Sequence, residues 1–180
     1  MRKWNFKRRV KQYTRKRKEF VPYAQIKQVV VLFESKGEKE DKAYHDIIQQ
    51  LKADGKQVQA FAFMEKSKNM MYSREGITIL DKKQLTLLHL PEEQILQQLK
   101  NTTCDVIFDL TTHTILPLQY MLLYIDAKCR VGIQAEKLLQ PDFMIGTEAN
   151  LHNDMSVITP NLDFLFNQML FYLKTISTSL

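Results

Sequence analysis

The residues best suited to chemistry follow an apolar stretch near the middle of the chain. Asp109 ends that stretch, and Thr111, Thr112 and His113 come directly after it. If the stretch is a strand and the next apolar segment a helix, these side chains lie at the carboxyl end of a strand, where α/β sheets bind ligands. Main-chain N–H groups at the start of a helix, together with the hydroxyls, would favour a phosphate or a carboxylate.

The same residue types are common in turns and at helix starts. Thr and Asp side chains accept hydrogen bonds from the first N–H groups of a helix, so simple capping is the competing interpretation. The segment also lacks the glycines that let a phosphate approach the backbone of a nucleotide-binding loop. Capping and anion binding therefore both remain open.

A second candidate loop follows the first apolar run of the chain. It contains Ser35, which we include among the candidate ligand-binding residues, but it has neither of the glycine-rich nucleotide motifs. Glu34 and Glu38 in the same loop would repel a phosphate. An ordinary solvated loop is the alternative interpretation.

Metal binding and nucleophilic catalysis find little support in the sequence. Glu148, His152 and Asp154 carry suitable ligand atoms, but they fall in an expected loop and no other histidine stands at ligand spacing from them. Cys104 and Cys129 both open expected strands, which predicts buried free thiols rather than a disulfide or a reactive pair. We expect no metal site and no cofactor.

The first 20 residues form a strongly basic arm. Ten of them are Lys or Arg and only Glu19 is acidic, which gives a formal charge of +9, whereas the other 160 residues sum to −3. Such an arm indicates an anionic partner. The cations that we expect to contact it are Arg2, Lys3, Lys7, Arg8, Arg9, Lys11, Arg15 and Lys16.

The arm also carries an apolar stripe at helical spacing. Phe6, Val10, Tyr13 and Phe20 fall on one face, and Pro22 then ends the helix. One interpretation is a helix docked on the globule with a solvated basic face. The alternatives are contact with nucleic acid, with aromatic rings stacking on bases, binding to an anionic membrane surface, and an organellar transit peptide, although the arm lacks serine.

Beyond the arm, apolar runs of strand length alternate with amphipathic helical segments. A continuous apolar run is typical of a strand buried on both faces of a parallel sheet. The expected strands are 28–33, 57–63, 106–110, 127–133 and 143–146, with further extended segments at 77–80 and 85–90. The expected helices are 41–53, one starting at Pro91, one after His113, and 161–176.

This alternation predicts an α/β fold. We expect a three-layer, Rossmann-like domain with a mostly parallel sheet of about five strands, helices on both faces and a basic N-terminal helix. The arm would span 1–22 and the single domain 23–180, since 180 residues suit one core rather than two. No apolar run approaches the ~20 residues that cross a bilayer. With two free cysteines, the expected location is the cytoplasm.

Part of the chain resembles a known enzyme family. Residues 105–110 (DVIFDL), the apolar helix after them and residues 127–133 (AKCRVGI) are similar to the N-terminal half of the heptosyltransferase-like glycosyltransferases, a resemblance that covers residues 104–133. It implies a Rossmann-like domain. Over nearly its full length the chain looks more like a small uncharacterised bacterial family with similar basic, "VVVLFE", "DVIFDLT" and "DFMI" segments.

Two functions follow as expectations. The first is a non-catalytic binding or adaptor protein whose arm engages an anionic partner, nucleic acid or a membrane surface, and whose domain holds a small anion. The second is a single-domain enzyme, or the remnant of one, acting on a phosphorylated or nucleotide-sugar ligand around residues 109–113. Removal of the arm and a screen with anionic metabolites would separate them.

Overall fold

A computed structural model describes residues 2–13, 18–37, 39–65, 76–133, 136–146 and 161–175. The strands are β1 (Gln28–Glu34), β2 (Gln57–Met64), β3 (Ile77–Asp81), β4 (Thr103–Asp109), β5 (Asp126–Ile133) and β6 (Phe143–Ile145). The α-helices are α1 (Arg2–Gln12), α2 (Lys42–Ala53), α3 (Glu93–Asn101), α4 (Leu116–Tyr124) and α6 (Leu162–Thr175). Two short 3-10 helices, η1 (Tyr23–Gln25) and η2 (Lys82–Gln84), complete the described elements.

The six strands form one sheet in the order β3-β2-β1-β4-β5-β6, and each neighbouring pair is parallel. β1 and β4 lie side by side at the centre, with Val30 paired to Ile107. The α/β prediction is confirmed, with six strands rather than about five. The additional one is β3, which the sequence offered only as an extended segment.

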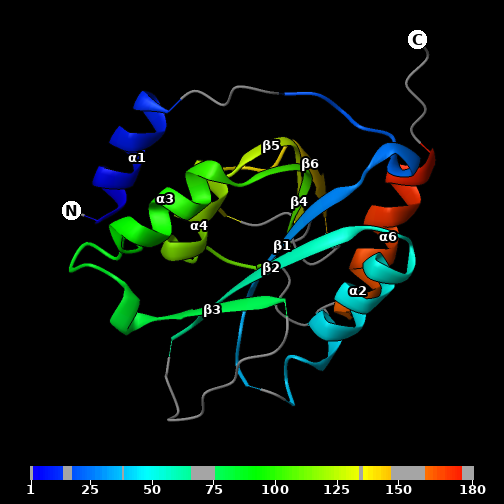
Figure 1. Cartoon of the computed structure of the whole chain (residues 1–180), viewed down its shortest axis with the longest axis horizontal. Coiled ribbons are helices and arrows are strands. Elements are labelled where there is room, and N and C mark those ends of the chain that lie inside the picture. The colour runs from blue at the N-terminus through cyan, green and yellow to red at the C-terminus, as the bar shows by residue number, and fades with distance from the viewer. Residues whose placement is uncertain are drawn as a thin grey trace.

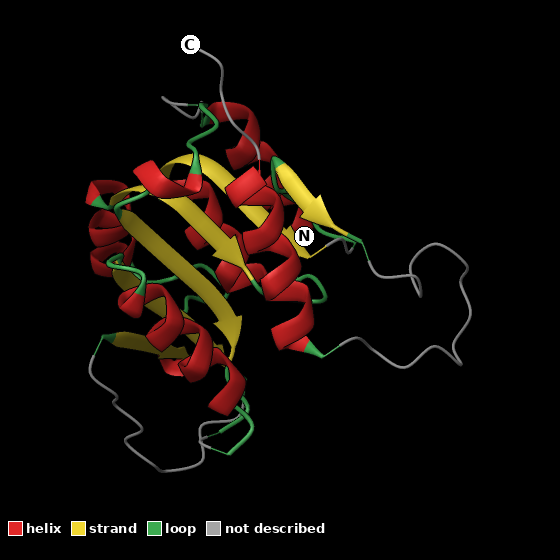
Figure 2. Cartoon of the chain, turned by 90° about the vertical axis from the view of Figure 1, so that its right-hand side faces the viewer, coloured by secondary structure: helices red, strands yellow, loops and turns green. Residues whose placement is uncertain are grey.

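Helices cover both faces of the sheet (Figure 1). α2 and α6 pack on one face, and α3 and α4 pack on the other. Figure 2, turned by 90°, has the strands running side by side between these layers. Val29 and Val31 of β1 join the core under α2 and α6, whereas Val30 and Leu32 join the core under α3 and α4. The apolar run of β1 is unbroken because both faces of this strand are buried.

The N-terminal helix adds a further layer outside α4 (Figure 1). Residues 117–124 of α4 are all buried, and the helix has no polar stripe. A helix that is apolar all round must be covered on every side. The sheet covers one side of α4 and α1 covers the other, so α1 is part of the packed structure.

Three details of the sequence prediction are wrong. The segment 85–90 is a tight turn and not a strand, closed by a bridge between Leu85 and Pro91. Because Pro91 belongs to that bridge, α3 begins at Glu93. The arm helix ends at Gln12, and Phe20 packs against the core on the other face of the sheet, because the chain there runs beside β5.

The cysteine prediction is confirmed. Cys104 and Cys129 are both buried and neither forms a disulfide. Burial, with a smaller contribution from the charge of Asp105, raises the pKa of Cys104 to about 12. Its thiol therefore stays protonated at neutral pH and is a poor nucleophile.

Candidate functional site

The predicted site lies where the order of the sheet reverses. From β1 the chain builds outward to β2 and β3 on one side and then to β4, β5 and β6 on the other. In such sheets the carboxyl ends of the two central strands form the usual ligand site. Glu34 and Ser35 stand at the end of β1, and Asp109 stands at the end of β4. The topology therefore brings both predicted loops to one edge.

On the β4 side, Asp109 and Thr111 are satisfied by the protein itself. Lys137 places Nζ 2.9 Å from Oδ2 of Asp109, and the two side chains are 0% and 2% exposed. The hydroxyl and the N–H of Thr111 both donate to Oδ1 of the same carboxylate, at 2.6 and 3.2 Å. The carboxylate of Asp109 is thus held inside the fold and faces no open space.

The β1 side has a similar internal arrangement. Asp41, directly before α2, is buried and accepts hydrogen bonds from the Ser35 hydroxyl at 2.5 Å and from the Lys36 N–H at 3.0 Å. A hydroxyl and an N–H in the loop after β1 are the groups that a bound phosphate would need. Here the Asp41 carboxylate takes that position and adds a negative charge.

The exposed part of the edge is a small mixed-charge cluster. Oε2 of Glu34 lies 3.9 Å from both Nζ of Lys36 and Nε2 of His113, and the latter two side chains are largely solvated. Thr112 beside them is exposed. Tyr44 of α2 borders the cluster, and its burial, followed by the charges of Asp41 and Glu34, raises its pKa to about 12.

The expected link between this segment and a helix start is wrong. α4 begins at Leu116 after the N-cap residue Ile115, and no side chain caps it. Thr114 instead donates its hydroxyl to the Glu136 carbonyl at 2.6 Å. Thr112 and His113 therefore lie outside the first turn of α4, and neither the capping nor the helix-terminus interpretation describes them.

These contacts define what the edge can do. Asp109, Thr111 and Ser35 bind other groups of the protein. The buried carboxylates of Asp41 and Asp109 disfavour a phosphate between the strands. His113, Lys36 and Thr112 remain accessible to a ligand at the surface. Asp41 and Lys137 were missed because an acid before a helix and a lysine in a loop carry no distinctive sequence signal.

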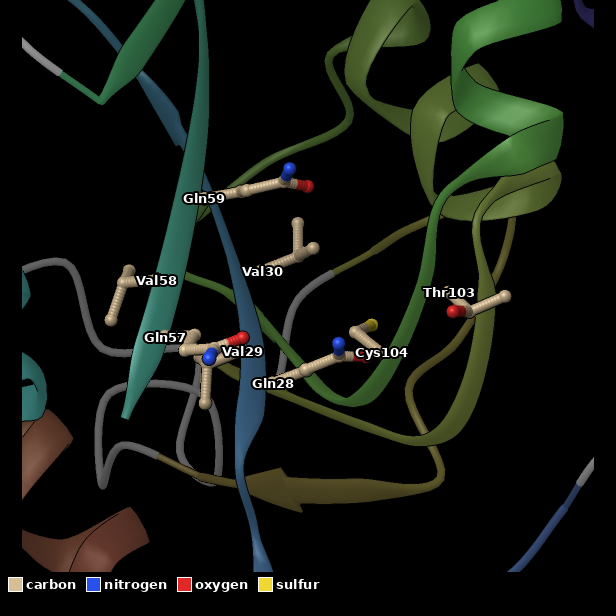
Figure 3. Close-up of a pocket in the computed structure, with 8 residues that line it drawn as sticks. All are labelled: Gln28, Val29, Val30, Gln57, Val58, Gln59, Thr103 and Cys104. Atoms are coloured by element: carbon tan, nitrogen blue, oxygen red, sulfur yellow. The ribbon is translucent and has the colours of Figure 1, made fainter. Parts of the chain in front are cut away.

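A separate cavity opens at the opposite edge of the sheet, as Figure 3 shows. It has a volume of about 140 Å³ and lies at the amino ends of β1, β2 and β4. Its lining residues are Gln28, Val29, Val30, Gln57, Val58, Gln59, Thr103 and Cys104. Amides and a hydroxyl supply hydrogen bonds there without charge, so the cavity suits water or a small neutral molecule.

Phe6, Arg9 and Tyr13 hold α1 on α4. The Phe6 ring is fully buried and meets the edge of Tyr120, with the ring centroids 4.9 Å apart. The Arg9 guanidinium donates to the Tyr124 hydroxyl at 2.6 Å. The Tyr13 hydroxyl donates to the Tyr124 carbonyl at 3.0 Å. The apolar stripe of the arm thus faces the protein, as the docked-helix interpretation predicts.

The opposite face of α1 carries the charges. Lys3, Lys7 and Lys11 follow one another at i, i+4 and i+8, and all three are exposed. Beside them Trp4 is 65% exposed, with the Arg8 guanidinium 5.8 Å from its ring centroid. We call these five residues the cationic face. No acidic residue occurs anywhere in α1.

Several predicted residues lie outside this description. Arg15 and Lys16 fall outside the described residues, as does the side chain of Arg2. The metal candidates Glu148, His152 and Asp154 also fall outside them. Within the described ranges, no group of three or more His, Cys, Asp or Glu side chains could hold a metal ion.

Comparison with protein families gives a match over nearly the whole chain. A family model described as a family of unknown function (DUF6913) matches residues 1–176. No curated protein and no solved structure matches the chain, and the resemblance to glycosyltransferases finds no support in these comparisons. In the part of the chain that the structure describes, no helix has the length and apolar character to cross a bilayer. The chain belongs to the DUF6913 family.

Proposed function

We propose that this protein is a non-catalytic nucleic-acid-binding or adaptor protein, and that the cationic face of α1 contacts the partner. The observation that carries the proposal is the fixed orientation of that face. Phe6, Arg9 and Tyr13 hold one side of the helix on α4, so the opposite side presents its charges outward. Lys and Arg side chains arranged in this way neutralise phosphates and release counterions.

Nucleic acid fits the geometry better than a membrane surface does. A basic helix binds a membrane by inserting its apolar stripe into the lipid interface. In this protein the stripe is already buried against α4. The exposed Trp4 ring among cations instead suits stacking on an unpaired base, which favours a single-stranded region.

The sheet edge supports a binding role over an enzymatic one. Its deepest polar groups, Asp41 and Asp109, bind other parts of the chain. At the opposite edge, burial raises the pKa of the Cys104 thiol, which makes this thiol a poor nucleophile. The accessible His113 and Lys36 could add to the anion-binding surface of the molecule. Two buried free thiols suit a reducing compartment, as the cytoplasmic expectation requires.

The test replaces charge without disturbing the docking contacts. Lys3, Lys7, Arg8 and Lys11 are changed together to Gln, and binding to a fluorescent single-stranded oligonucleotide is measured by anisotropy. Four phosphate contacts predict that wild-type affinity falls by roughly 50-fold between about 50 and 200 mM salt. The quadruple variant should lose most of the affinity at low salt and most of this salt dependence.

A matched variant controls for net charge. Lys39, Lys52, Lys82 and Lys83 are exposed and lie outside α1, so changing all four to Gln removes the same number of positive charges. Affinity in this control should stay within about twofold of wild type. Equal losses in the two variants would contradict a specific role for the cationic face and indicate non-specific attraction.

Trp4 provides a direct reporter because it is the only tryptophan of the chain. Stacking on a base should quench its fluorescence, whereas insertion into anionic vesicles should shift the emission to shorter wavelength. The change Trp4→Ala should weaken oligonucleotide binding by about tenfold, the range of one base–aromatic stack. A vesicle response without an oligonucleotide response would overturn the proposal.

A further inference from the structure

A groove lies on the other flank of α1. It has a volume of about 540 Å³ and runs between α1, the 85–91 turn and the start of α3. Its lining residues are Arg9, Thr86, Leu87, Leu88, Leu90, Pro91, Glu93 and Leu96. The walls are therefore mainly apolar, with one cation and one anion at their borders.

Backbone hydrogen bonds define the conformation of the 85–91 turn. The Thr86 N–H donates to the Leu90 carbonyl at 2.8 Å, and the His89 N–H donates to the Thr86 carbonyl at 2.9 Å. His89 adopts a left-handed backbone conformation with φ of 60°. Hydrogen bonds thus fix the two residues at the corner, which are Leu87 and Leu88.

Leucine is an unusual residue at such a corner. Gly, Pro, Asn, Asp and Ser dominate tight turns because of their backbone geometry and local hydrogen bonding. Leu87 is 94% exposed and Leu88 is 38% exposed. Nothing in the geometry of the turn requires either side chain, and exposed apolar groups beside a groove mark an interaction surface.

The surface has a protrusion and a concavity next to each other. A two-fold axis beside the groove would place the leucine corner of each copy against the groove of the other, which is the self-complementary arrangement of a symmetric dimer. The charges agree with this pairing, because Arg9 of one copy would face Glu93 of the other. Within its own chain Arg9 donates to the neutral Tyr124 hydroxyl, and Glu93 contacts Gln97 and Lys100.

The charges of the cationic face do not repel a second copy in the groove, because they lie on a different side of α1. In a helix with 3.6 residues per turn, Arg9 lies on one flank of the buried Phe6 position, whereas Lys3, Lys7 and Lys11 lie on the other. We infer that a second copy of this chain binds in the groove and forms a symmetric dimer. The inference stands independently of the proposed nucleic-acid binding, and the dimer would carry two cationic faces.

The experiment is sedimentation velocity over a range of protein concentrations, after nucleic acid has been removed. The wild-type chain should form a dimer whose dissociation constant rises at least tenfold in a Leu87→Ser/Leu88→Ser variant. Because both residues are more than one-third exposed and neither belongs to a buried cluster of the described residues, circular dichroism and Tm should change little. The matched control changes Phe164 and Phe171, two exposed residues of α6, to Ser and should still dimerise.

A charge exchange tests the pairing itself. Glu93→Arg should weaken the dimer, and the double variant Arg9→Glu/Glu93→Arg should recover at least part of the affinity. A wild-type chain that is monomeric at every concentration would overturn the inference. So would a dimer that the leucine variant leaves intact, or one that only the α6 control dissociates.

Discussion

The ion pair between Asp109 and Lys137 joins the end of β4 to the segment before β6. Removing one partner of a buried pair leaves the other charge without compensation, which typically costs about 3–5 kcal/mol. We therefore expect Lys137→Met to lower the free energy of unfolding by about that amount, measured by urea denaturation. The double variant Asp109→Asn/Lys137→Met should be more stable than Lys137→Met alone. If the double variant lost as much free energy of unfolding as Lys137→Met and Asp109→Asn lose in sum, the two side chains would not be coupled.

Asp105 ties three strands together at the amino edge of the sheet. Its Oδ2 accepts from the Lys27 and Gln28 N–H groups at 2.8 and 3.0 Å, and its Oδ1 lies 2.9 Å from Nζ of Lys128. Burial acts to raise the pKa of this carboxyl, but the two N–H groups and Lys128 outweigh it, so the pKa is lowered from 3.8.

This shift predicts a pH dependence. A carboxyl with a lowered pKa contributes stability that is present above its ordinary pKa and is lost as pH falls through the lowered value. The free energy of unfolding should therefore decrease below about pH 4. Asp105→Asn should flatten this decrease in acid denaturation curves, whereas Asp46→Asn at an exposed position of α2 should not. Identical slopes in wild type and Asp105→Asn would contradict the assignment.

At the scale of the element, α1 depends on its docking residue. Truncating a buried phenylalanine costs about 3 kcal/mol or more, which corresponds to roughly a 100-fold larger undocked population. Phe6→Ala should therefore accelerate tryptic cleavage within α1 by up to about that factor. Trp4→Ala, on the exposed side of the same helix, is the control and should leave the rate near wild type. Equal cleavage rates in the wild type and in Phe6→Ala would mean that Phe6 does not hold the arm.

Elements with one strong pattern could be predicted from the sequence. β1 and β4 are buried on both faces, so their apolar runs are unbroken and indicate strands of a parallel sheet. The 85–91 turn could not be predicted, because its two leucines mimic a strand. The internal partners Asp41 and Lys137 were also beyond prediction, because the contacts form only when distant loops meet in the fold.

At the scale of the whole molecule, the layers make the arm necessary for solubility. Deleting residues 2–13 would uncover the outer side of α4, where Tyr120 and Tyr124 contact Phe6, Arg9 and Tyr13 of the arm. We expect this deletion to bind a hydrophobic dye and to aggregate, as judged by fluorescence and size-exclusion chromatography. The quadruple Gln variant of the cationic face should do neither. A deletion variant that neither binds the dye nor aggregates would show that the arm is dispensable for packing.

During synthesis, the cationic face acquires its orientation only after α4 has been made, because α1 docks on α4. The arm leaves the ribosome before its binding surface on residues 116–124, which emerges more than one hundred residues later. Until then the basic segment has no packed side and no defined orientation. A partner that recognises the ordered array of Lys3, Lys7 and Lys11 therefore selects chains whose central sheet has already assembled.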